Sequence, residues 1–262
     1  MTDILLLMTR IAEAETSGDV WDLACGQYRA WGFARANYGF TRFRSDRSIG
    51  DPDDALFLTT SDAAYVQRYF RNNFYARTPL FRWAEHNSGS CTWTWVKAAF
   101  EAGTLPPDEA ETVVQNAAIG VVAGISVSFP TASMRSKGAL GLIADPGMGH
   151  EAVDQFYAEH RLELVALAHM MHLKLIQLPY TARRRALTSR QREALEWVAD
   201  GKTSQDVGVL MGVSAAMVEK HLRLARETLD VGTTAQAVAK AALMNQIFYR
   251  PVEAFPTAMA GR

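Results

Sequence analysis

The sequence predicts an α+β protein: an N-terminal α/β/α sandwich around a mainly antiparallel sheet, followed by a C-terminal helix-turn-helix domain of four helices. Three observations support this prediction. Helical patterns stand at both ends of residues 1–178, with short strand-like runs between them. Pro179 ends the last of these helical patterns and begins a short linker, residues 179–186. From Leu187 onward, four short helical patterns follow one another, with Gly-containing turns between them.

The bulk composition is that of an ordinary globular protein. At 262 residues, with 48% hydrophobic and 21% charged residues, the chain is long enough for about two domains. Net charge is only −1, but Lys and Arg outnumber Asp and Glu over residues 179–250, whereas the remainder is acidic. This asymmetry favours a DNA-binding segment attached to a domain with another role. Two cysteines are too few for a disulfide framework, and the N-terminal apolar run is too short for a membrane span, so we expect a cytoplasmic protein.

The first part of the chain predicts helices and then strands. Two helices are expected within the first thirty residues, with a break at Gly18 and Asp19. Residues 33–43 predict a strand rich in aromatic side chains, and ALFLTT predicts a second one. Ser61 is the expected cap of the next helix, DAAYVQRYFRNN.

The middle of the chain alternates between the two kinds of element. Pro79 starts a helical turn, and CTWTW predicts a strand with Trp93 and Trp95 on one side. PPDEAETVVQNAAI begins with Pro and acidic residues, as a helix start should. GVVAGISVSFP and GALGLIA predict paired strands, and a long helix over residues 151–178 carries an apolar stripe at helical spacing.

The C-terminal region shows clear helix-start signals. Thr188 precedes Gln191 by three residues, which is the spacing of a capping box, and Thr203 stands in the same relation to Asp206. The second helix, TSQDVGVLM, is expected to bury Val207, Leu210 and Met211. Its Gly208 leaves room for a closely crossing helix. Ser214 is placed to cap the third helix, and a fourth is expected over about residues 234–248.

The third helix, AAMVEKHLRLARETL, has the features of a recognition helix. Val218 and Leu222 lie four residues apart and are expected to face inward. The outward set is Glu219, Lys220, Arg223 and Arg226. These side chains can reach base edges and phosphates in a major groove. The alternative is a helical packing module with a solvated charged face.

The C-terminal motifs resemble a known family. LTSRQREAL, GKTSQDVGVLMGVS and VEKHL are similar to the DNA-binding domain of LuxR-type transcription regulators, without gaps over residues 187–248. Family members usually have Glu where Gln191 stands and Ala where Gly208 stands. Because Gln also serves in a capping box, both departures are mild.

The first region contains an unusual density of aromatic side chains over residues 65–95, which predicts either a ligand pocket or an aromatic core. The resemblance implies the pocket, with its binding residues at Tyr65, Tyr69, Thr78, Trp93 and Gly124. In the family this pocket takes an N-acyl homoserine lactone. A Trp donates to the lactone carbonyl, a Tyr donates to the acyl carbonyl, and an Asp accepts from the amide N–H.

Two of these positions depart from the family pattern. Tyr65 replaces the Trp but can still donate, whereas Thr78 replaces the Asp and removes a charged acceptor. A hydrogen bond to a charged group contributes about 1.5–3 kcal/mol, against about 1 kcal/mol for a neutral pair. The sequence therefore predicts weakened lactone binding, a different ligand, or a regulator that needs no ligand.

The resemblance implies a cytoplasmic homodimer that binds double-stranded DNA at half-sites with two-fold symmetry, with RNA polymerase as a candidate partner. Glu219 and Arg223 are the expected base-edge contacts. The expected phosphate contacts are Lys202, Thr203, Lys220 and Arg226. The rival prediction is an orphan, ligand-independent regulator whose first domain only dimerises or docks a partner protein.

Other site classes find little support in the sequence. No nucleophile, base and orienting group stand in a recognisable arrangement, so an enzyme is not expected. His169 and His172 are one helical turn apart, but no further ligand completes a metal site, and no cofactor is expected. The predicted domains are residues 1–178 and 187–250, with a basic linker at Arg183, Arg184 and Arg185 and a disordered tail over residues 251–262.

Overall fold

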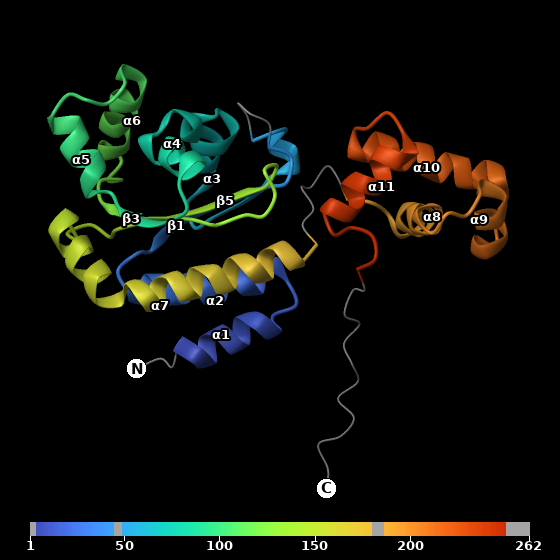
Figure 1. Ribbon diagram of the computed structural model, residues 1–262, viewed down its shortest axis with the longest axis horizontal. Helices are drawn as coiled ribbons and strands as arrows, with labels where there is room; N and C mark the ends of the chain where they lie inside the picture. Colours follow the sequence, from blue (N-terminus) through green and yellow to red (C-terminus); the bar gives the residue numbers. More distant parts are fainter. Residues whose placement is uncertain (1–3, 45–48, 180–185, 250–262) are drawn as a thin grey trace, which may run out of the picture. The chain divides into compact units, whose positions relative to one another are not determined.

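The computed structural model describes residues 4–44, 49–179 and 186–249, which form two compact units (Figure 1). The first unit ends at Leu175 and the second begins at Ile176. The linker arginines and the predicted tail lie outside the described residues. No helix of the described part is long and apolar enough to cross a membrane.

A five-stranded antiparallel sheet forms the middle layer of the first unit, which confirms the predicted α/β/α sandwich. Its strand order is β2-β1-β5-β4-β3. The strands are β1 (Arg35–Thr41), β2 (Leu56–Thr59), β3 (Gly89–Thr92), β4 (Gly124–Ser128) and β5 (Lys137–Ile143). Along β5, for example, Leu140 and Leu142 are buried, and the residues that alternate with them point to the other face.

One face of the sheet is covered by three helices, α1 (Ile4–Glu13), α2 (Ser17–Ala30) and α7 (His150–Gln177), as Figure 1 shows. The break between α1 and α2 lies at residues 14–16, not at Gly18 and Asp19 as predicted. Thr16 is the cap of α2, because its hydroxyl accepts from the backbone N–H of Asp19 at 3.1 Å. Gly18 therefore lies inside the first helical turn, where its lack of a side chain does not stop the helix.

Short helices cover the other face of the sheet: α3 (Ala63–Val66), a π-helical turn η2 (Gln67–Arg71), the 3₁₀ turn η3 (Phe74–Arg77), α4 (Pro79–His86), α5 (Thr94–Glu101) and α6 (Pro107–Ala117). A further 3₁₀ turn, η1 (Pro52–Asp54), precedes β2. The cap of α3 is Asp62, not Ser61, since its carboxylate accepts from the N–H of Tyr65 at 2.8 Å.

The predicted strand CTWTW is wrong in its second half. β3 ends at Thr92, and Trp93 is the cap residue of α5, with backbone angles outside the extended region. Strand β3 ends where its pairing with β4 ends. Thr92 pairs with Ile125, and Gly124, the residue before Ile125, accepts a hydrogen bond from the N–H of Trp93. The chain turns there, so Trp93 and Trp95 do not share a strand face.

His172 of α7 is buried and packs among aromatic side chains. Its ring stacks on Phe129 with centroids 4.1 Å apart, and its Nδ1 lies 2.8 Å from the hydroxyl of Tyr38. Burial lowers its pKa to about 4, with His169 and Arg42 adding to the shift. Within the described residues, no group of three His, Cys, Asp or Glu side chains could hold a metal ion.

The pKa of His172 predicts a loss of stability on acidification. The side chain of His172 binds a proton near pH 6.5 in the unfolded chain but only near pH 4 in the folded chain. Its contribution to the free energy of unfolding is therefore complete above pH 6.5 and is lost as the pH falls to about 4. We expect a loss of roughly 3 kcal/mol over this window. Denaturant titrations at several pH values, repeated with His172→Gln, would measure it. An equal pH dependence in the variant would contradict the assignment.

The described part of the second unit contains four helices, α8 (Ser189–Ala199), α9 (Ser204–Met211), α10 (Ala215–Leu229) and α11 (Thr234–Leu243). The predicted capping box is present at Thr188 with Gln191, and the helix start predicted at Thr203 with Asp206 is a capping box as well. Ser214 caps α10, as predicted. These signals were readable because a capping box is formed by residues close in sequence.

Packing within the second unit corrects two predictions. Leu210 is 48% exposed, and Gly208 takes its place on the buried face of α9 together with Val207 and Met211. A side chain at Gly208 would place a Cβ 2.8 Å from the carbonyl oxygen of Val213, in the turn that leads into α10, so the close approach of this turn excludes one here. The fourth helix ends at Leu243 rather than near Phe248.

Candidate ligand cavity and DNA-binding surface

A cavity of about 440 Å³ lies in the first unit between the sheet and the short helices α3 to α6. Its size is within the range of small-molecule sites. Part of its wall consists of small residues on adjacent strands: Gly39 pairs with Ala139, and Gly141 pairs with Asn37. Gly141 leaves open space above it, since a Cβ there would come no closer than 4.0 Å to the ring of Trp93.

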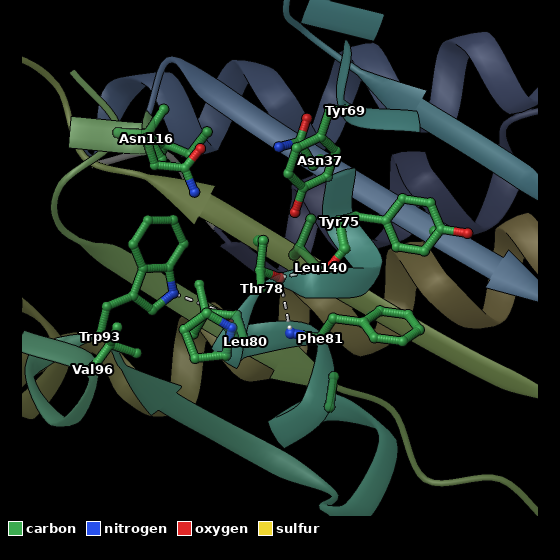
Figure 2. A pocket seen from close by; sticks show the side chains of 18 of the residues that line it. Asn37, Tyr69, Tyr75, Thr78, Leu80, Phe81, Trp93, Val96, Asn116 and Leu140 are labelled. Carbon is green, nitrogen blue, oxygen red and sulfur yellow. Dashed lines mark hydrogen bonds between the residues drawn. The ribbon is translucent and has the colours of Figure 1, made fainter. Parts of the chain in front are cut away.

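Four of the five predicted ligand residues line this cavity: Tyr65, Tyr69, Thr78 and Trp93. They come from α3, η2 and the segments before α4 and α5. Figure 2 shows Tyr69, Thr78 and Trp93 around the same space. The fifth, Gly124, is not a lining residue.

Tyr65 presents a hydroxyl hydrogen to the cavity. Its oxygen accepts from Asn37 Nδ2 at 2.7 Å, and Asn37 Oδ1 in turn accepts from the hydroxyl of Thr59 at 2.7 Å. No acceptor for the Tyr65 hydrogen is found within the described residues. Burial raises the pKa of Tyr65 to about 12, so the group stays protonated at neutral pH. Tyr65 can therefore donate a hydrogen bond to a ligand carbonyl.

The hydroxyl of Thr78 is engaged in local hydrogen bonds. It donates to the carbonyl of Tyr75 at 2.7 Å and accepts from the N–H of Phe81 at 3.2 Å, as the cap of α4 (Figure 2). Because its hydrogen is donated to Tyr75, Thr78 supports helix α4 and does not donate to a ligand. The ring of Tyr69, which lines the same cavity, stacks on Tyr65 with centroids 5.0 Å apart.

Trp93 forms part of the aromatic wall of the cavity and does not donate a hydrogen bond to a ligand. Its indole N–H donates to the hydroxyl of Ser126 at 3.0 Å, and its ring packs with Val121 and Ile143 in a buried cluster. Gly124 supports this ring, because a Cβ there would lie 2.9 Å from it. The structure therefore gives Gly124 a packing role beneath the cavity.

The sequence analysis did not identify several polar residues that line the cavity, among them Asn37, Ser126 and Asn116. The first two lie on strands, at positions whose neighbours in sequence are buried apolar residues. Alternation of polar and apolar residues was the available signal. Asn116 lies on α6, and the sequence does not distinguish an Asn that lines a cavity from an Asn at a solvated position of a helix.

The predicted DNA-contacting side chains lie on α10 and before α9. Glu219, Lys220 and Arg223 are exposed, and the buried face of α10 includes Val218 and Leu222, as predicted. Glu219 accepts from the hydroxyl of Ser204, and Arg223 forms an exposed ion pair with Glu227. Such exposed pairs contribute at most about 1 kcal/mol, so both side chains can exchange them for DNA contacts.

The remaining predicted DNA-contacting side chains differ in how firmly they are held by other residues of the protein. Lys202 and Thr203 are exposed at the start of α9, where backbone N–H groups favour a phosphate. The hydroxyl of Thr203 is held in the capping box with Asp206. Arg226 is half-buried and donates to the hydroxyl of Thr234 at 2.9 Å, so it is more restrained than the sequence suggested.

Two family models match the chain. The model described as "Autoinducer binding domain" matches residues 16–175, and the one described as "Bacterial regulatory proteins, luxR family" matches residues 185–241. Among similar proteins is the transcriptional activator protein SolR of Ralstonia solanacearum, 28% identical over 81% of this chain and 85% of its own length. The transcriptional activator protein LuxR of Aliivibrio fischeri is 22% identical over 74% of this chain and 76% of its own length.

A solved structure shares the fold. The crystal structure of Escherichia coli SdiA matches with a TM-score of 0.54 and 18% identity, and it covers 94% of this chain and 98% of that one. At this identity, the likeness concerns the arrangement of helices and strands alone.

Proposed function

This chain belongs to the LuxR family of bacterial transcription regulators, and we propose that it senses an N-acyl homoserine lactone or a related small apolar signal through its first unit. It then binds a two-fold-symmetric DNA site as a homodimer. The observation that carries the sensing role is the apolar cavity of about 440 Å³ with the unused hydroxyl hydrogen of Tyr65 inside it. The surface of α10 carries the DNA-binding role.

The sensing role predicts a ligand-dependent rise in melting temperature. With N-octanoyl homoserine lactone at a hundred times its Kd, the folded state gains about 2.7 kcal/mol, which corresponds to several degrees. Tyr65→Phe should weaken binding about tenfold, because it removes one donated hydrogen bond of about 1–1.5 kcal/mol. Thermal denaturation and calorimetric titration of the full chain measure both effects. An unchanged Kd in Tyr65→Phe would exclude Tyr65 as a donor.

A second function, an orphan regulator that needs no ligand, draws support from the hydroxyl of Thr78, which is engaged in local hydrogen bonds to Tyr75 and Phe81. In that case the cavity stays closed to lactones, and the first unit only dimerises or docks a partner. The two functions differ in one result. A folded, DNA-binding protein whose melting temperature does not respond to any acyl chain length supports the orphan regulator.

The DNA-binding role predicts position-specific effects of α10 side chains. If Arg223 donates to a guanine, Arg223→Ala should cost about 1–3 kcal/mol and relax the preference at one base pair. Lys220→Ala should instead weaken binding to all sequences and reduce its salt dependence. Binding selections from a random DNA pool, done with each variant, separate the two outcomes. Loss of affinity without a change in preferred sequence would make Arg223 a phosphate contact.

A further inference from the structure

The amide of Asn37 joins two side chains from other elements. Asn37 on β1 is directly opposite Thr59 on β2, and Tyr65 belongs to α3. The amide nitrogen Nδ2 donates to the hydroxyl oxygen of Tyr65 at 2.7 Å, and Oδ1 accepts from the hydroxyl of Thr59 at 2.7 Å. The amide is therefore held at both of its ends.

A backbone N–H sets the direction of this chain of hydrogen bonds. The N–H of Ser61 donates to the hydroxyl oxygen of Thr59 at 3.0 Å. Since a backbone N–H can only donate, the oxygen of Thr59 accepts there, and its single hydrogen is directed to Oδ1 of Asn37. With Oδ1 engaged by Thr59, the donor end of the amide faces Tyr65. Tyr65 thus receives a hydrogen bond from the cavity wall and keeps its own hydrogen for the cavity.

The opposite orientation of the amide would remove this donor from the cavity. If Oδ1 faced Tyr65, it would accept the hydrogen of the Tyr65 hydroxyl, and the hydrogen of Thr59 would lose its acceptor. The two orientations leave the unpaired hydrogen in different places, because Tyr65 and Asn37 line the cavity whereas Thr59 does not. The orientation of the Asn37 amide therefore decides whether that hydrogen reaches a ligand.

Building on the proposed sensing function, we infer that Asn37 and Thr59 are positioning residues that hold Tyr65 as a hydrogen-bond donor toward the cavity. Thr59 acts through Asn37, because it does not line the cavity itself. The ligand class that fits presents an acceptor oxygen to Tyr65. A ligand group that can only donate would meet the hydrogen of Tyr65 there.

Thr59→Val tests the residue that lies outside the cavity wall. Valine is similar in size and suits a strand, but it cannot donate to Oδ1 of Asn37. The amide is then free to turn its oxygen to Tyr65. The full chain should therefore bind N-octanoyl homoserine lactone about tenfold more weakly, as expected for the loss of one hydrogen bond. Thr59→Ser keeps the hydroxyl and should restore binding to within about twofold of wild type, measured by calorimetric titration.

Asn37→Asp changes the same network with little change in size. A carboxylate offers only acceptors, so it takes up the hydrogen of Tyr65, and lactone affinity should again fall about tenfold. In a Tyr65→Phe background, Thr59→Val and Asn37→Asp should each have less than about a twofold further effect, because the donor is already absent. A change in the shape of the cavity would instead weaken binding equally in both backgrounds.

The outcomes separate the positioning role from the sensing function. Unchanged affinity in Thr59→Val and Asn37→Asp, while Tyr65→Phe weakens binding, overturns the inference and leaves the sensing function standing. Equal losses with and without the Tyr65 hydroxyl also overturn it. Absence of lactone binding by folded wild-type protein overturns the sensing function and the positioning role together.

Discussion

Gly124→Ala is expected to destabilise the first unit by more than about 3 kcal/mol, which lowers its melting temperature by roughly 6–12 °C. The cause is geometric. A Cβ on Gly124 would lie 2.9 Å from the ring of Trp93 and still closer to the carbonyl oxygen of Leu142. The backbone oxygen is fixed by the sheet, in which Gly124 pairs with Ile143, so the strand itself must shift.

Calorimetry of the full chain would measure the loss, with the transition of the second unit as an internal reference. Gly141→Ala provides the control, because a Cβ at this position of β5 comes no closer than 4.0 Å to any other side chain or backbone atom outside its immediate neighbours. Equal melting temperatures for Gly124→Ala and wild type would show that the ring of Trp93 and the strand can both move at little cost.

The family resemblance marked Gly124 as a ligand residue, and the structure shows why sequence alone could not define its role. Its importance comes from Trp93 and from the neighbouring strand, both of which are distant in sequence. The same holds for Thr78. The sequence places Thr78 beside Pro79, but it does not show the two local hydrogen bonds that engage the hydroxyl of Thr78.

The sequence was most informative where the determinants are local. The capping boxes at Thr188 and Thr203 join residues three positions apart, and the sequence predicts the first as a capping box and the second as a helix start. In contrast, the exposure of Leu210 depends on which part of the chain packs against α9. The backbone of the turn into α10 lies close to Gly208, so the buried face of α9 includes this glycine and leaves Leu210 partly exposed.

The cavity residues on the strands are the least predictable from the sequence, since their positions depend on strand register. Asn37 and Gly141 are directly opposed on β1 and β5, although more than a hundred residues separate them in the printed sequence. No local pattern places a glycine of one strand beside an asparagine of another. The register creates the open space between them and the helices, and this space makes Gly141 a natural position at which to test the cavity.

Gly141→Val is expected to leave the protein folded and to weaken ligand binding about a hundredfold. The new side chain would point into the space beneath Trp93, where the nearest atom to its Cβ is 4.0 Å away, and valine suits a strand. Stability should hold or rise, because each buried methyl-sized group contributes about 0.8 kcal/mol. A ligand in the same space would meet an overlap that costs a few kcal/mol, and each 1.4 kcal/mol is tenfold in Kd.

The contrast between the two glycines is what makes this prediction decisive. Gly124 lies beneath Trp93 and Gly141 faces open space, so Gly124→Ala destabilises the first unit, whereas Gly141→Val fills the cavity. Titration of Gly141→Val with N-octanoyl homoserine lactone, beside DNA binding by the same sample, measures ligand and operator affinity separately. Undiminished lactone affinity in a folded variant would place the ligand outside this cavity. If the variant binds DNA without responding to ligand, the cavity itself carries the signal.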